Sequence, residues 1–244
     1  MIMSQVWKCY KGFRLSWKSV INLVCFATFV CAATFTVSQL RIANYFPIKE
    51  VKIAGMQHVN HAEVQRLLIP LVNKGFFAVS VEHIKESLAQ FPWVADASVR
   101  RVWPNQIIIQ VAEKSPLARW NEDKLLSTSG ELFSPTRDTY PVGLPQFIGP
   151  EGVQLKMMEN YAQVKPLLAA LQAKIIRFEM SPAHVWNLTL DNGIKLHIGH
   201  KDILTRVADF VKVYPKIIGD RASEVDSVDL RYSNGLAVRW KTMT

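Results

Sequence analysis

The sequence predicts an α+β protein with a single N-terminal transmembrane helix and two folded domains behind it. Three patterns lead to this prediction: an apolar run long enough to cross a bilayer, a strand–helix–helix–strand–strand order after it, and a series of short strands separated by turn residues in the second half. We therefore divide the chain into a tail (1–19), a membrane helix (20–40), a first domain (46–115) and a second domain (116–244).

The membrane helix is predicted from residues 20–37, which read VINLVCFATFVCAATFTV and contain no charged side chain. With the residues up to Leu40 the run reaches about 20 residues, the length of a helix that crosses roughly 30 Å of hydrocarbon. A cleaved signal peptide, with a weak site at residues 30–32, is the alternative. The run is longer than the 7–15 apolar residues usual for such a peptide, which favours a retained anchor.

The charges around the apolar run predict its direction. The first 40 residues contain no acidic residue, and their basic residues all precede the run: Lys8, Lys11, Arg14 and Lys18. Positive charge is retained on the cytoplasmic side of a membrane helix. We therefore expect a single-pass type II protein of the cell inner membrane, with a cytoplasmic N-terminus and periplasmic domains.

The first domain is predicted as a small sheet with two helices on one face. The predicted elements are a strand over 47–55, a helix after the N-cap Asn60, a helix after the N-cap Ser80, and a hairpin of strands Val94–Val102 and Ile107–Val111. Asn60 is followed three residues later by Glu63, as in a capping box. Trp103–Pro104–Asn105 forms the turn of the hairpin.

The second domain is predicted as a mixed domain with a mainly antiparallel sheet and helices. The predicted strands are 117–120, 124–128, 131–133, 175–180, 185–190, 194–198, 225–232 and 236–240. Residues 153–171 form a helix that Pro166 kinks or restarts, and Asp202 caps a second helix that Pro215 ends or bends. Residues 141–150 contain proline and glycine and are expected to form a loop without regular structure.

The polar residues predict binding rather than catalysis. His58 and His61 are three apart, as are His197 and His200, but the first pair straddles a helix start and the second a strand end, a poor frame for aiming both rings at one metal. All three cysteines lie in the first 40 residues, and no nucleophile elbow, phosphate loop or dinucleotide fingerprint occurs. We expect no enzyme activity, no metal, no cofactor and no small-molecule substrate.

Nucleic acid is also an unexpected partner. The formal net charge is +9, but beyond residue 40 the excess is mild, with 25 basic residues against 20 acidic ones. No basic helix and no aromatic-basic RNA motif is present. What the predicted fold offers is strand edges, whose unpaired backbone groups accept a strand from another chain.

Several segments resemble the FtsQ/DivIB family of bacterial cell-division proteins, whose first exported domain is a POTRA domain. The segments are VKIAGMQHV (51–59), FPWVADASVRRVWPNQIIIQVAEKSPLARWN (91–121), MSPAHVWNLTLDNGIKL (180–196), RVADFVKVYP (206–215) and VDLRYSNGLAVRW (228–240). The resemblance runs from about residue 41 to 240 and is broken mainly over 134–152 and 216–224.

The resemblance implies a divisome scaffold that binds FtsB and FtsL directly on the periplasmic side and links cytoplasmic with periplasmic division proteins during septum formation. An inner-membrane POTRA protein of an envelope assembly or secretion system is the alternative of the same class. A membrane-anchored periplasmic hydrolase is the alternative of another class.

The resemblance also implies a binding site, because in this family FtsB adds a strand to the C-terminal strand region. The matching residues here are Tyr232, Ser233, Asn234, Gly235 and Trp240. We expect Tyr232 and Trp240 to be the side-chain anchors, since aromatic residues dominate binding hot spots. Family members often have basic residues where this chain has Ala183–His184, so the charge contact is either weaker here or supplied by Arg231 or Arg239.

Overall fold

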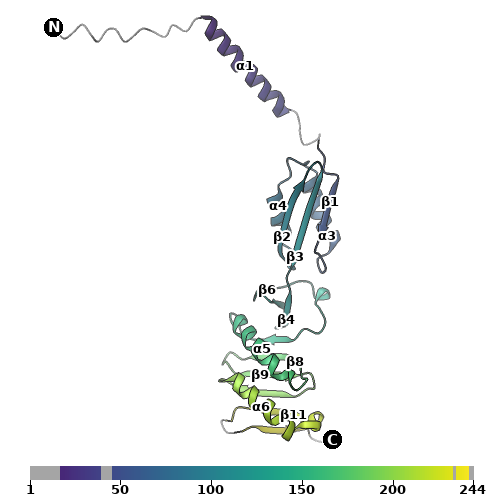
Figure 1. Ribbon diagram of the computed structural model, residues 1–244, viewed down its shortest axis with the longest axis vertical. Helices are drawn as coiled ribbons and strands as arrows, with labels where there is room; N and C mark the ends of the chain where they lie inside the picture. Colours follow the sequence, from purple (N-terminus) through teal and green to yellow (C-terminus); the bar gives the residue numbers. More distant parts are fainter. Residues whose placement is uncertain (1–16, 40–45, 233–234, 242–244) are drawn as a thin grey trace, which may run out of the picture.

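The computed structural model describes residues 17–39, 46–232 and 235–241 (Figure 1). Residues 17–39 form helix α1 (Trp17–Gln39), in which the side chains of Ser19 and of residues 36–39 are not described. Among the described residues, no helix combines the length and the apolar character that crossing a membrane requires. The helix itself is confirmed, and the membrane span over 20–40 stays a prediction.

The first domain has the predicted order of elements. It consists of β1 (Glu50–Ala54), α3 (His61–Val72), α4 (Val81–Leu88), β2 (Val94–Val102) and β3 (Gln106–Glu113). The sheet order is β1-β3-β2, with β1 parallel and β2 antiparallel to the central β3. Both predicted caps are confirmed: Asn60 accepts a hydrogen bond from the Ala62 amide, and Ser80 accepts one from the His83 amide.

The second domain is built on one nine-stranded sheet with the order β12-β11-β10-β9-β8-β7-β4-β5-β6. Its strands are β4 (Pro116–Trp120), β5 (Lys124–Ser127), β6 (Leu132–Phe133), β7 (Gln146–Ile148), β8 (Ile175–Met180), β9 (Trp186–Leu190), β10 (Lys195–Gly199), β11 (Val225–Asp229) and β12 (Ala237–Trp240). The pairs β4–β7, β7–β8 and β10–β11 are parallel and the other pairs antiparallel, so the predicted mixed, mainly antiparallel sheet is confirmed.

One expectation for this domain is wrong, because residues 141–150 are not entirely loop. They contain β7, which lies between β4 and β8 and pairs in parallel with both. Phe147 at its centre is fully buried against Tyr161 and Phe178. The strand exists because both neighbours supply backbone partners, which a three-residue segment cannot show by its own periodicity.

The two helices of the second domain, α5 (Gln154–Ala169) and α6 (Ile203–Ile217), pack against each other and over the sheet (Figure 1). Each continues through its proline, Pro166 or Pro215, so Pro166 does not restart α5 and Pro215 does not end α6. Asp202 stands at the N-cap of α6 but has φ 54° and makes no capping hydrogen bond with its side chain. The described residues also form the short 3-10 helices η2 (Arg137–Thr139) and η3 (Gly219–Glu224).

Two hydrophobic cores lie along the molecule, and the boundary between them does not follow the chain. The second core is centred on the sheet under α5 and α6, with Phe147, Phe178 and Phe210 among its fully buried side chains. The first core lies under α3 and α4, but it also contains Leu125 of β5 and Phe133 of β6. The two domains therefore share part of their packing.

Candidate functional site

The candidate binding edge is β12, which lies at one end of the nine-stranded sheet. It pairs in antiparallel fashion with β11, with Trp240 opposite Val225 and Ala237 opposite Asp229. No other strand within the described residues lies on its outer side. An unpaired strand side presents backbone N–H and C=O groups that can bond to a strand of another chain.

The side chains of β12 alternate between two environments. Val238 and Trp240 are half-buried and pack against the second core, whereas Ala237 and Arg239 are exposed. The Arg221 guanidinium carbon lies 4.3 Å from the centre of the Trp240 ring, a cation–π contact. Trp240, expected as a binding anchor, therefore also has a packing role within the domain.

Tyr232 lies just before the connection to β12, and its side chain is 59% exposed. Its position is fixed through the backbone: the Arg206 guanidinium of α6 donates hydrogen bonds to the carbonyl oxygens of Leu230 and Tyr232. Gly235 is exposed, and a Cβ there would meet nothing within 4 Å. The expected partner-binding residues Ser233 and Asn234 lie outside the described residues.

The two arginines near this edge have different environments. Arg231 forms an ion pair with Asp229, with Nη2 to Oδ2 at 2.6 Å. The hydrogen bond from Arg231 lowers the pKa of the Asp229 carboxyl, and the same contact raises the pKa of Arg231. Arg239 is exposed and has no ion pair within the described part of the chain. Both arginines line a shallow hollow of about 570 Å³ beside β11 and β12.

The Ala183–His184 segment forms the exposed turn between β8 and β9. His184 has φ 57°, and its amide donates to the Ser181 carbonyl at 2.8 Å. In the sheet, β10 and β11 lie between β9 and β12, so this turn does not belong to the candidate binding edge.

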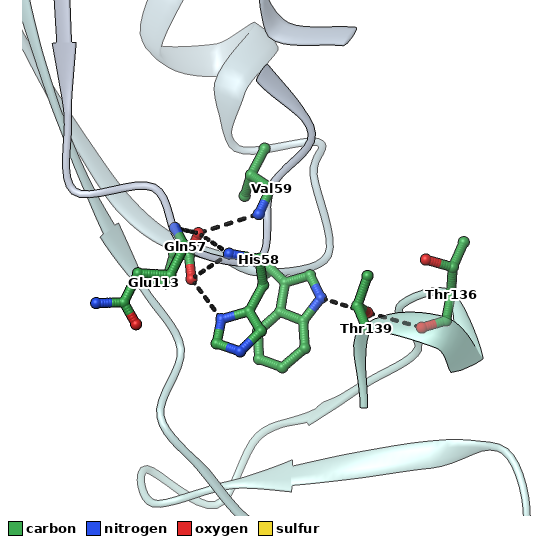
Figure 2. A network of polar contacts seen from close by, with 7 residues as sticks. Gln57, His58, Val59, Glu113, Thr136 and Thr139 are labelled. Atoms are coloured by element: carbon green, nitrogen blue, oxygen red, sulfur yellow. Dashed lines mark hydrogen bonds and ion pairs between the residues drawn. The ribbon is translucent and has the colours of Figure 1, made fainter. Parts of the chain in front are cut away.

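A second polar constellation joins the two domains, and the sequence did not predict it (Figure 2). Glu113, at the end of β3, accepts hydrogen bonds from the backbone amides of Gln57 (2.7 Å), His58 (2.9 Å) and Val59 (3.1 Å). Its other oxygen lies 2.8 Å from His58 Nδ1. Burial tends to raise the pKa of Glu113, but the hydrogen bonds from His58 and the three amides outweigh it and lower the pKa.

The aromatic half of this constellation extends into the second domain. The His58 ring stacks on Trp93 with ring centres 4.2 Å apart, and Trp93 meets Phe133 of β6 edge to face at 5.2 Å. The Trp93 indole N–H donates to Thr139 Oγ1 at 2.9 Å, and Thr139 donates in turn to the Thr136 carbonyl (Figure 2). Trp93 thus packs across the domain boundary.

The remaining histidine pair does not converge on a metal site. His197 Nδ1 lies 2.9 Å from Asn187 Oδ1 on the adjacent strand. Across the described residues, no group of three or more histidine, cysteine, aspartate or glutamate side chains could hold a metal ion.

Comparison with known proteins places both domains in one family. A model of the FtsQ-type POTRA domain matches residues 46–114, and a model described as "Cell division protein FtsQ/DivIB, C-terminal" matches residues 118–231. The chain is 37% identical to the cell division protein FtsQ of Coxiella burnetii over 196 residues, which is 80% of this chain and 81% of that protein. The chain belongs to the FtsQ/DivIB family.

Other FtsQ proteins are similar over the same share of the chain. The identity is 34% with FtsQ of Shewanella oneidensis, over 82% of this chain and 77% of that protein. It is 31% with FtsQ of Escherichia coli, over 81% of this chain and 74% of that protein. Membership of this family supports a role for the chain in cell division. Its two domain models meet at residues 114–118, directly after Glu113, so the constellation in Figure 2 lies at the junction of the POTRA and C-terminal domains.

Proposed function

We propose that this chain is a membrane-anchored divisome scaffold that binds FtsB and FtsL on the periplasmic side and links them to cytoplasmic division proteins during septum formation. The observation that carries the proposal is the unpaired outer side of β12, in a chain of the FtsQ/DivIB family. The function is binding and positioning, without a catalysed reaction, a cofactor or a nucleic-acid partner.

The binding mode proposed is strand addition. A partner strand beside β12 extends the sheet through backbone hydrogen bonds, and its side chains then lie next to the exposed Ala237 and Arg239. Arg239 has no ion pair among the described residues, so it is free to meet an acidic side chain of the partner, whereas Arg231 is already engaged with Asp229. Tyr232 adds an exposed aromatic ring at the end of the same edge.

The anchor proposed is α1, a single-pass helix of the inner membrane with the N-terminus in the cytoplasm. Every described side chain of α1 is exposed, including the large apolar Phe26 (69%) and Phe29 (72%). Apolar side chains exposed all around a helix favour a lipid environment. Extraction of membranes at alkaline pH tests the anchor: an integral protein stays in the pellet, and a protein that is released refutes it.

The partner site is tested with the full chain in detergent and the periplasmic parts of FtsB and FtsL from the same cell. We expect Tyr232→Ala and Arg239→Glu to weaken binding at least tenfold, which is about 1.4 kcal/mol. Arg66→Glu on α3 is the matched control for a charge reversal far from β12, and it should bind like the wild type. Loss of binding in Arg66→Glu, or none in the two edge variants, refutes the site; absence of binding by the wild type refutes the function.

A further inference from the structure

Three exposed aromatic side chains gather at one end of the POTRA domain. They are Phe46, Phe77 and Trp103, with exposed fractions of 37%, 52% and 72%. Phe46 and Phe77 lie edge to face with ring centres 5.2 Å apart. Exposed side chains this large need an explanation when they gather on one surface.

Backbone hydrogen bonds hold the segments with these rings together. The Phe76 amide donates to the Phe46 carbonyl at 2.9 Å, which fixes the loop after α3 beside the entry of the chain. The Lys49 amide donates to the Asn105 carbonyl at 2.9 Å, which fixes the β2–β3 turn beside the same entry segment. We call this surface, formed by residues 46–49, 73–77 and 103–105, the entry end.

The entry end is the part of the domain nearest in sequence to α1. β1 starts there and β2 ends there, whereas Glu113 and the junction with the second domain lie at the other end of β3 (Figure 1). From Gln39, the last residue of α1, to Phe46 there are seven peptide steps, which can span at most about 25 Å even when fully extended. If α1 lies in a bilayer, the entry end is therefore close to the lipid surface.

The charges at the entry end suit an anionic surface. Lys49 and Lys74 of the entry end, and Arg101 on β2 two residues before Trp103, are exposed and have no ion pair within the described residues. Two acidic residues lie near these segments in the sequence. Glu50 forms an ion pair with Lys52 at 3.3 Å and accepts a hydrogen bond from Gln106, whereas Glu82 accepts one from the Ser80 hydroxyl at 3.4 Å and keeps its negative charge.

From these observations we infer that the entry end of the POTRA domain rests on the outer surface of the bilayer, with Trp103, Phe77 and Phe46 in the headgroup layer and the lysines and arginine on anionic headgroups. Tryptophan is enriched at this depth because its ring is apolar and its N–H is polar, and basic residues near a membrane helix bind anionic lipid. The inference rests on the proposed anchor. It makes the bilayer a second support that orients the POTRA domain.

The inference is tested with the full chain in nanodiscs of phosphatidylethanolamine and phosphatidylglycerol, with brominated lipid as a quencher of tryptophan fluorescence. The signal of Trp103 is the difference between the wild type and Trp103→Phe. Trp240→Phe is the matched control, since Trp240 lies on β12 in the other domain. We expect brominated lipid to reduce the fluorescence of Trp103 at least twofold and to leave the fluorescence of Trp240 unchanged. Lys74→Glu with Arg101→Glu should reduce the quenching of Trp103.

The outcomes separate the inference from the proposed anchor. A chain that elutes with the nanodisc but has an unquenched Trp103 refutes the inference and leaves the anchor standing. A chain that does not elute with the nanodisc refutes the anchor, and the inference with it. Quenching of Trp103 that persists in nanodiscs of phosphatidylcholine alone, and in the double charge variant, overturns the role of the basic residues and leaves that of the aromatic rings.

Discussion

Glu113 carries the most polar contacts at the domain junction, so its removal is the sharpest test of the architecture. Glu113→Ala leaves the amides of Gln57, His58 and Val59 without their acceptor. Gln57 is exposed and water can replace the carboxylate there, but the other two amides are partly buried, and each unsatisfied donor costs about 1–3 kcal/mol. We therefore expect Glu113→Ala to lower the free energy of unfolding by roughly 3 kcal/mol. Glu113→Gln keeps one acceptor oxygen and should lower it by less.

The measurement is the urea midpoint of the full chain in detergent, converted to free energy with the slope of the transition. Glu159→Ala is the matched control, because Glu159 is an exposed glutamate of α5. A Glu113→Ala variant within about 0.5 kcal/mol of the wild type refutes the reasoning, since that is the usual range of surface substitutions.

The same residue predicts a pH dependence with a definite sign. Because folding lowers the pKa of Glu113, the carboxylate stabilises the folded state above its unfolded pKa of about 4.3. That stabilisation is lost as the pH falls through the lowered pKa of the folded state. The stability difference between the wild type and Glu113→Gln should therefore be constant near neutral pH and shrink in acid; a difference that grows in acid contradicts the assigned contacts.

Three further predictions concern stability and use the same urea measurement. Phe147→Ala should destabilise the chain by about 3–5 kcal/mol, because the ring is fully buried on the interior strand β7; a loss below about 1 kcal/mol contradicts that burial. Gly55→Ala should cost at least about 2 kcal/mol, because Gly55 has φ 89° and a Cβ would lie 2.0 Å from the Val111 carbonyl oxygen; an unchanged midpoint excludes this geometry. Asn60→Ala should cost about 1 kcal/mol through the lost cap of α3, and Asn60→Asp should keep most of the stability.

Features set by short-range chemistry could be predicted from the sequence. The caps at Asn60 and Ser80 depend only on residues two or three positions away, and both predictions are confirmed. The predicted strands 185–190 and 194–198 form the β9–β10 hairpin, which depends on the local Asp191–Asn192–Gly193 turn. The same locality explains why the order of elements in the POTRA domain could be predicted.

Features set by distant partners could not be predicted in this way. β7 is a strand because β4 and β8 lie on either side of it, and the prolines and glycines around it suggest a loop. The free arginine at the site is a different case, because Arg231 pairs with Asp229 only two positions away. Arg239 has no ion pair among the described residues. The junction of Glu113, His58 and Trp93 likewise joins residues up to 55 positions apart. Locally, the sequence shows only that Trp93 is a large side chain of a kind that is usually packed, and not which residues it packs against.

The nine-stranded sheet has two ends, and the packing leaves them unequal. At the β6 end, the Phe133 side chain belongs to the core of the POTRA domain and contacts Trp93, so the last strand there packs against the neighbouring domain. At the β12 end, no described strand lies on the outer side. Strand edges invite pairing, and β12 offers four residues for it whereas β6 has only two. This asymmetry, which depends partly on the domain junction, is the strongest argument for β12 as the proposed binding edge.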